Sequence, residues 1–224
     1  MGAGLEMTCG IKSYVTVLAI LCLAACGTLR EDNPGTQVAG LAGQLITGQT
    51  GARAAVLVSQ EEILSNPGKY MRVNIRDLDR WDTMVEAARN GSKVTWVDSE
   101  NNSITLENGV IVATRGLPRD LMGADTAQVW AAIRAGGGNA QRTHDFLTDQ
   151  DQISQQLLQC RIAQQGSDTV RRLGQTLDAT RFEEKCAGEG LQLTNIYWVN
   201  RSGLLLRSLQ AISPDAGYLQ IDVF

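Results

Sequence analysis

The chain has 224 residues, of which 43% are hydrophobic and 20% are charged, and its formal net charge at neutral pH is −4. This length is enough for one domain with a sizeable hydrophobic core. A mildly acidic chain without a basic cluster gives no electrostatic reason to expect a nucleic-acid partner.

The first 26 residues have the organisation of a lipoprotein signal peptide. Lys12 supplies a positive charge, and an apolar run over residues 14–25 follows it. That run is shorter than the roughly 20 apolar residues that a transmembrane helix needs, and it suits the apolar core of an export signal. It ends in the sequence LAAC at residues 23–26, a lipobox, in which small residues precede the cysteine that accepts diacylglycerol.

We therefore predict cleavage before Cys26, acylation of that cysteine and export to the periplasm, with lipid as the membrane anchor. The alternative is an ordinary signal peptide that ends near a cysteine. Initiation at Met1 or at Met7 stays open, because the first residues contain Glu6 and no early basic residue. Gly27 follows the cysteine, where an aspartate would often retain a lipoprotein on the inner membrane, so we expect an outer-membrane location that faces the periplasm.

Beyond the signal peptide (residues 1–25), the sequence predicts an acylated tether over residues 26–51 and one β-rich periplasmic domain over residues 52–224. The tether is rich in Gly, Thr, Gln and Pro, and a weak helix is expected over residues 41–47. A short helix is expected over residues 60–64, where the turn signal Asn66-Pro67-Gly68 ends it.

Alternation of apolar and polar residues predicts strands through most of the remaining chain. The expected strands cover residues 71–76, 94–96, 104–106, 110–112, 153–164, 191–199, 204–212 and 218–224. Asn108-Gly109 predicts a tight hairpin turn, and a helix is expected over Asp120–Arg134. Some eight or nine strands with short turns predict a mainly β fold: an antiparallel barrel-like or sandwich domain with one or two short helices.

The signal peptide accounts for three of the five cysteines, because two are removed with it and Cys26 carries the lipid. The other two, Cys160 and Cys186, are predicted to form a disulfide in the oxidising periplasm; the alternative is two unrelated buried thiols. The sequence has no CxxC motif and no Cys/His set with metal-ligand spacing, so we expect no metal and no cofactor.

Few residues point to catalysis. His144 is the only histidine, and no nucleophile motif accompanies it, so a structural role is expected. Two carboxylate pairs, Asp98 with Glu100 and Asp149 with Asp151, have the chemistry for glycoside hydrolysis, but acids in turns are usually solvated.

Aromatic side chains are the other candidate set. Trp96, Trp130, Tyr197 and Trp198 could stack on sugar rings, although core packing is the expected role of most of them. Because successive residues of a strand face opposite sides, at least one of Tyr197 and Trp198 is expected in the core.

Four segments of the chain resemble the YjbF/GfcB family of lipoproteins. They are residues 114–122 (TRGLPRDLM), 182–186 (FEEKC), 195–199 (NIYWV) and 207–214 (RSLQAISP), together with a cysteine at the position of Cys160. The resemblance implies a mainly β, barrel-like domain, encoded among genes for export of group 4 capsule or other exopolysaccharide. It also implies a periplasmic accessory role at the outer membrane, and it implies no catalytic residue.

Three functions follow as hypotheses. The favoured one is a lipid-anchored, non-enzymatic accessory protein for capsule or exopolysaccharide export or assembly, with the membrane and either export proteins or polysaccharide as partners. The alternatives are a polysaccharide-modifying hydrolase that uses a carboxylate pair and a sugar-binding module. Two carboxylates facing each other in a concave cleft would favour the hydrolase, and a coplanar row of exposed Trp and Tyr would favour the sugar-binding module.

Overall fold

The computed structural model describes residues 58–76, 80–188 and 190–224, and all of them lie in one compact unit, Thr50–Phe224. The signal peptide, Cys26, the tether and the helix expected over residues 41–47 lie outside the described residues. In the described part of the chain, no helix has both the length and the hydropathy needed to cross a bilayer.

The described residues form two helices and a single twelve-stranded sheet, in which neighbouring strands run antiparallel. The helices are α3 (Gln60–Ser65) and α4 (Ala127–Arg134). The strands are β1 (Tyr70–Ile75), β2 (Arg80–Asn90), β3 (Lys93–Val97), β4 (Ser103–Glu107), β5 (Val110–Arg115), β6 (Gly123–Asp125), β7 (Gly137–Leu147), β8 (Ile153–Arg172), β9 (Gln175–Gly188), β10 (Leu191–Val199), β11 (Leu205–Ser213) and β12 (Gly217–Val223). The predicted mainly β, antiparallel fold is confirmed.

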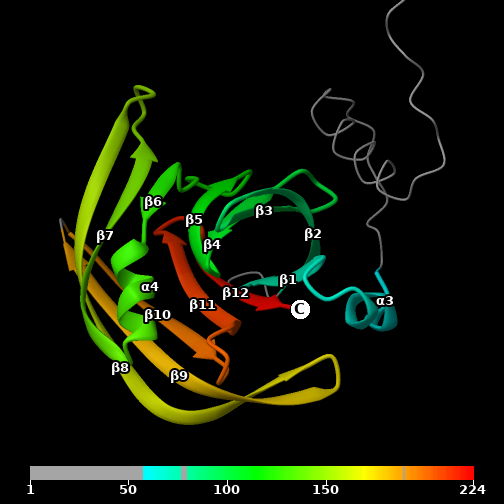
Figure 1. Cartoon of the computed structure of the whole chain (residues 1–224). Coiled ribbons are helices and arrows are strands. Elements are labelled where there is room, and N and C mark those ends of the chain that lie inside the picture. Colours follow the sequence, from blue (N-terminus) through cyan, green and yellow to red (C-terminus); the bar gives the residue numbers. More distant parts are fainter. Residues whose placement is uncertain (1–57, 77–79, 189) are drawn as a thin grey trace, which may run out of the picture. The chain divides into compact units, whose positions relative to one another are not determined.

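The strand order shows how the sheet is built. Strands β1 to β5 form one meander, β6 to β12 form another, and β1 pairs with β12 to join them. Strands β5 and β6 are left as the two edges, and the sheet curls into a nearly closed barrel that brings these edges toward each other (Figure 1). The amide of Thr114 on β5 donates to the carbonyl of Leu121, 2.9 Å away, just before β6 begins.

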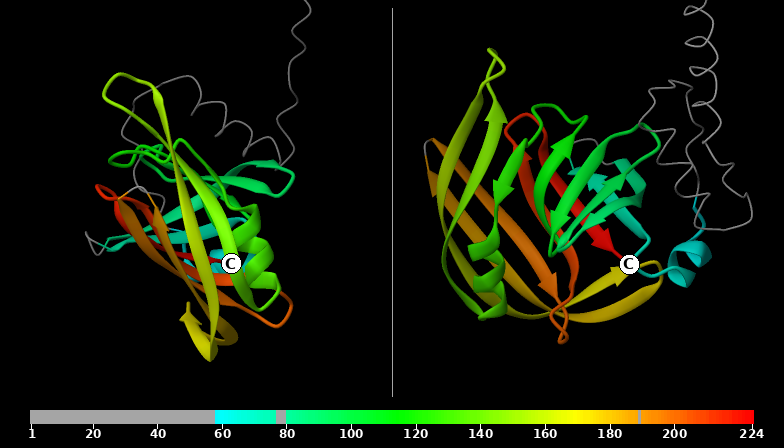
Figure 2. Two further views of the ribbon diagram at one scale, coloured as in Figure 1. Left: turned by 90° about the vertical axis from the view of Figure 1, so that its left-hand side faces the viewer. Right: turned by 45° about the horizontal axis from the view of Figure 1, so that its top comes forward.

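The sheet curls tightly over β1–β5 and β12 and opens into a broad curved sheet over β7–β10, with α4 on its concave side (Figures 1 and 2). Each half has its own core. In the tight half Met71, Trp96 and Ile221 belong to one buried cluster. In the open half Val129 and Ile133 of α4 pack with Leu158 and Phe182 of the sheet.

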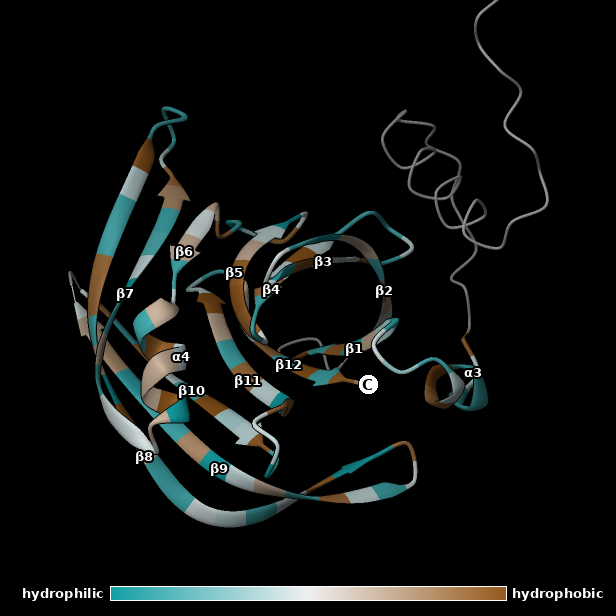
Figure 3. Ribbon diagram, in the orientation of Figure 1, coloured by the Kyte–Doolittle hydropathy of each residue, from teal (hydrophilic) through white to brown (hydrophobic). Residues whose placement is uncertain are grey.

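Figure 3 shows apolar and polar residues alternating along most strands, which is the pattern of a sheet with one buried face. The turn at Asn108-Gly109 is also confirmed, because both residues have positive φ values, 52° and 87°, as a two-residue hairpin of this type requires.

Two expectations need correction. The described residues form twelve strands where eight or nine were expected; β2, β6, β7 and β9 are the additional ones. The helix expected from Asp120 begins only at Ala127, because Asp120 caps a loop and residues 123–125 pair with β7 instead.

Candidate functional site

An ion pair lies buried inside the open half of the barrel, between β7 and β9. Arg142 and Glu184 are 2% and 0% exposed, and Arg142 Nη1 lies 3.1 Å from Glu184 Oε2 and 3.2 Å from Oε1. Taking two charges out of water costs several kcal/mol per ion, so a buried pair needs further hydrogen bonds to hold it. Sequence reasoning missed both residues.

Strand β10 supplies those hydrogen bonds. Asn195 Nδ2 donates to Glu184 Oε2 at 2.7 Å, and the Tyr197 hydroxyl donates to the same oxygen at 2.6 Å. Burial, with the neighbouring carboxylate adding to it, raises the pKa of Tyr197 well above its usual value, so the hydroxyl keeps its proton. One carboxylate therefore ties β7, β9 and β10 together through charge-assisted hydrogen bonds.

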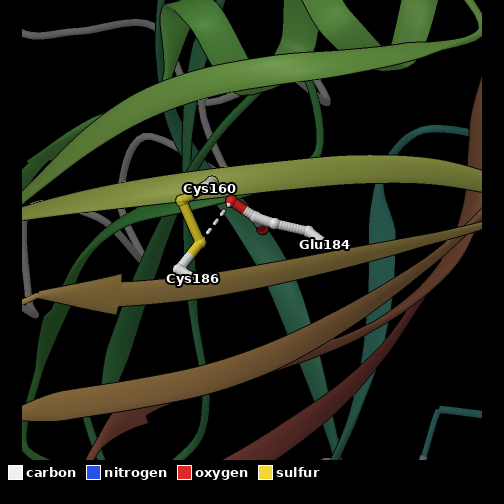
Figure 4. Close-up of side chains that lie close together, drawn as sticks. All are labelled: Cys160, Glu184 and Cys186. Atoms are coloured by element: carbon white, nitrogen blue, oxygen red, sulfur yellow. Dashed lines mark hydrogen bonds between the residues drawn. A yellow bond between two sulfur atoms is a disulfide. The ribbon is translucent and has the colours of Figure 1, made fainter.

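The two candidate disulfide cysteines lie beside the same carboxylate (Figure 4). Cys160 on β8 and Cys186 on β9 are direct cross-strand partners, with Cα atoms 4.0 Å apart and sulfur atoms at a bonding distance of 2.04 Å. Cys186 Sγ lies 3.2 Å from Glu184 Oε1. Because a disulfide sulfur carries no proton, we interpret this as a close sulfur–oxygen contact.

The ligand-type atoms of Cys160, Glu184 and Cys186 lie within 4.8 Å of one another, which is close enough for a metal site. A metal would need the sulfurs as thiolates. In the structure the two sulfurs are bonded to each other, so this cluster does not fit a metal ion.

A second polar group crosses the interior from β11 to β5, which are not neighbours in the sheet. Gln210 is 1% exposed; its Oε1 accepts from the amide of Ile111 at 2.9 Å, and its Nε2 donates to the carbonyl of Gly109 at 3.0 Å. Its Nε2 also lies 2.8 Å from Ser208 Oγ. One amide side chain thus connects two strands that share no sheet hydrogen bonds.

The loop between the edge strands is held by Asp120. Its carboxylate accepts from the amides of Gly116 and Leu117 at 2.8 and 3.0 Å and from the Thr114 hydroxyl at 2.8 Å. Gly116 has a φ of +89°, and a Cβ there would collide with the Asn102 side chain, so the position requires glycine.

This loop also contacts the chain after β11. The Ser213 hydroxyl donates to the carbonyl of Pro118 at 3.2 Å, and Arg119 lies 3.7 Å from Asp215. The four family-like segments therefore each supply hydrogen bonds that connect strands or close the barrel. These segments are residues 114–122, 182–186, 195–199 and 207–214. Glu184 and Arg142 are too deeply buried for a substrate to reach them in this conformation.

His144 is also internal, on β7, and is 0% exposed. Neither ring nitrogen has a hydrogen-bond partner among the described residues, and the ring packs edge-on against Phe146. Burial, together with the charge of Arg142, lowers the pKa of His144 to about 3. The imidazole is therefore neutral at pH 7 and out of contact with solvent, so it cannot act as a general base on an outside substrate.

The candidate carboxylate pairs lie in turns. Asp98 accepts from the amides of Glu100 and Asn102 at 2.8 and 2.9 Å, so it caps the turn between β3 and β4. Asp149 and Asp151 are exposed at the tip of the β7–β8 hairpin. Both are ordinary positions for acids that stabilise or border a turn.

The candidate aromatics do not form one exposed row. Trp96 and Tyr197 are 3% and 0% exposed and belong to the core, as expected for at least one of the neighbours Tyr197 and Trp198. Trp198 is half-buried on the opposite face, where its Nε1 donates to Asp168 at 2.8 Å. Trp130 is half-buried and lines a groove.

Two grooves that open to solvent have basic side chains in their lining. The first, of about 690 Å³, lies between α4, β8–β10 and the β10–β11 turn, and we call it the α4 groove. Its charged lining residues are Arg134 and Arg201, both exposed. The second, of about 800 Å³, is lined by residues of β7–β10 and by Tyr218 of β12, and Arg161 and Lys185 are its charged lining residues. Both grooves are basic, although the chain is acidic.

Comparisons with known proteins agree with this fold. A family model described as group 4 capsule polysaccharide lipoprotein GfcB, YjbF matches residues 38–224. The crystal structure of the hypothetical lipoprotein YmcC from Escherichia coli K12 is similar, with a TM-score of 0.66 and 15% sequence identity, over 88% of this chain and 96% of that one. Among curated protein sequences, none matches the chain significantly. At this identity, the likeness to YmcC concerns the fold alone.

Proposed function

Because the chain belongs to the YjbF family of group 4 capsule polysaccharide lipoproteins, we propose that it is a non-enzymatic accessory protein that assists export or assembly of a capsule or related exopolysaccharide. It is anchored in the outer membrane through acylated Cys26, and its domain faces the periplasm. Its partners are export proteins or the polysaccharide itself.

The observation that supports a non-enzymatic role is the internal use of the polar side chains in the family-like segments. Glu184, Asn195, Tyr197 and Gln210 are each at most 1% exposed, and each is hydrogen-bonded inside the barrel. A general acid, base or nucleophile must reach the substrate directly or through one water molecule. These residues stabilise the fold, which leaves the exposed grooves as the surface for binding.

The anchor supplies the physical logic of an accessory role. Each buried CH₂ of an acyl chain contributes about 0.8 kcal/mol to membrane binding, so several chains hold the protein firmly. Confinement near the membrane raises the effective concentration of the domain at an export channel. A modest affinity for the partner is then sufficient. A version with the lipobox replaced by an ordinary cleavage site should complement poorly, and overexpression should partly restore it.

Deletion of the gene tests the proposal. Surface or secreted polysaccharide should fall while the cytoplasmic precursors are still made, and the purified protein should release no reducing ends from the polymer. Unchanged envelope polysaccharides in the deletion strain would contradict the accessory role. Release of reducing ends would favour the hydrolase instead, and Asp98 and Asp149 would be the first residues to substitute.

A further inference from the structure

The α4 groove combines an apolar floor with a polar rim. Ile133, Phe182 and Val199 line it and are at most 7% exposed, so they form its bottom. The exposed rim carries Arg134 and Arg201. A volume of about 690 Å³ lies within the range of roughly 300–1,000 Å³ that is typical of small-ligand sites. Such sites join apolar surface to a few polar groups that fix the orientation of the ligand.

One wall of the groove comes from the last turns of α4. Trp130 and Arg134 are four residues apart on this helix, so they are neighbours on one helical face. The Trp130 ring packs partly against the core and stays half-exposed. The indole therefore has a fixed position, and its open part can meet a flat apolar surface such as the CH face of a pyranose ring.

The β10–β11 turn forms the opposite wall. Asn200 Oδ1 accepts from the amide of Ser202 at 3.0 Å, from the Ser202 hydroxyl at 2.7 Å and from the amide of Leu204 at 2.9 Å. These bonds hold the turn in one conformation and leave the Arg201 side chain exposed over the groove. Gln164 and Asn108 also line the groove and can bond to sugar hydroxyls.

The charge of the groove indicates the kind of ligand. Neither Arg134 nor Arg201 forms an ion pair with another described residue, and no acidic side chain lines the groove. Arginine presents a planar fork of donors that matches a carboxylate. We propose that the α4 groove binds a short segment of an acidic polysaccharide, with Trp130 against a sugar ring and the two arginines on uronic-acid carboxylates. This inference rests on the proposed function for the choice of a polysaccharide.

Calorimetric titration of the full-length lipoprotein in detergent tests the proposal. The probes are an oligogalacturonate and a neutral galacto-oligosaccharide of the same length. We expect the acidic oligomer to bind at least tenfold more tightly, and more weakly as salt screens the arginines. The double variant Arg134→Gln/Arg201→Gln should bind the acidic oligomer at least tenfold more weakly than wild type and bind the neutral oligomer equally well.

Three further variants control for net charge and for the ring. Arg76→Gln/Arg171→Gln removes the same charge from exposed positions that line neither groove, and it should bind as wild type does. Trp130→Ala should weaken the binding of both oligomers. Trp130→Phe keeps an aromatic ring, so it should bind both oligomers more tightly than Trp130→Ala does. Thermal unfolding of each variant separates loss of binding from loss of fold.

Several results would overturn the inference: wild-type protein that binds neither oligomer, equal binding of both, or a groove variant that binds the acidic oligomer as tightly as wild type. Tripolyphosphate that binds as tightly as oligogalacturonate, with no effect of Trp130→Ala, would identify a general anion site and would also overturn it.

Complementation of the deletion strain separates this inference from the proposed function. If deletion lowers polysaccharide and Arg134→Gln/Arg201→Gln restores it fully, the groove inference fails and the accessory role stands. If deletion has no effect, the accessory role fails, and the titration still decides whether the groove binds acidic sugars.

Discussion

Mild acid should destabilise this protein through His144. The side chain is 0% exposed, and its pKa in the folded protein is lowered to about 3 by burial and by Arg142. In the unfolded chain an ordinary histidine has a pKa of about 6.5. The unfolded state therefore takes up a proton at a higher pH than the folded state. The stability contributed by neutral His144 is complete above about pH 6.5 and is lost as pH falls toward 3.

The size of the effect follows from the two pKa values. Each pH unit between them changes the free energy of unfolding by about 1.4 kcal/mol, so the loss is about 2 kcal/mol between pH 8 and pH 5 and about 4 kcal/mol between pH 8 and pH 3. His144 is the only histidine in the chain. Between pH 5 and pH 7 no other side chain has an ordinary pKa, so the loss can be assigned to this residue.

Urea unfolding at constant ionic strength, at pH 8, 7, 6 and 5, measures the effect. His144→Gln cannot titrate, so its free energy of unfolding should be nearly constant over this range, whatever its value at pH 8. Equal wild-type stability at pH 8 and pH 5 would refute the reasoning. So would a His144→Gln variant that loses as much stability as wild type.

Three further predictions concern the buried pair and the cysteines. Glu184→Gln should lower the free energy of unfolding by about 3–5 kcal/mol, because it leaves a buried arginine unpaired; Glu183→Gln, which removes the partly exposed partner of Lys185 at the preceding residue, should cost less than about 1 kcal/mol. Unreduced, unfolded protein should show no maleimide-reactive thiol at Cys160 or Cys186, and loss of the disulfide should cost about 3.5 kcal/mol in the chain-entropy model; two reactive thiols would contradict the bond. Cys26→Ser should take no palmitate label and run as an uncleaved precursor, and normal labelling would show that the anchor lies elsewhere.

Sequence reasoning found the elements in which the pattern of residue types matches the pattern of burial or backbone conformation in the fold. Strands such as β10, with Leu193, Tyr197 and Val199 buried on one face, show period-2 alternation of apolar residues. The Asn108-Gly109 turn is specified by the two residues that most readily adopt positive φ.

Strands β7 and β9 were missed because their inward positions hold polar residues. On β7 the buried side chains are Ala140, Arg142, His144 and Phe146, so hydropathy does not alternate although burial does. On β9 Glu184 lies between Phe182 and Cys186 in the same way. Arg142 and Glu184 stabilise each other's buried charge, but they lie far apart in the sequence. A single sequence does not show that two such residues pair.

The start of the helix was predicted too early, and the arginines of the α4 groove were missed, for a related reason. Residues 120–126 have apolar residues at roughly helical spacing, but tertiary hydrogen bonds to Asp120 outweigh this preference. Trp130 was recognised as a candidate for sugar stacking. Arg134 and Arg201 were not, because only the fold brings the end of α4 and the β10–β11 turn to one groove.

The buried ion pair also constrains how three strands of the sheet pair with one another. Arg142 is opposite Leu158 on β8, and Glu184 is opposite Ile162 on the same strand, so the pair reaches diagonally across Cys160. A slip of one residue in either pairing would turn one charge outward and leave the other buried alone, at a cost of several kcal/mol. The pair therefore fixes the register of β7, β8 and β9.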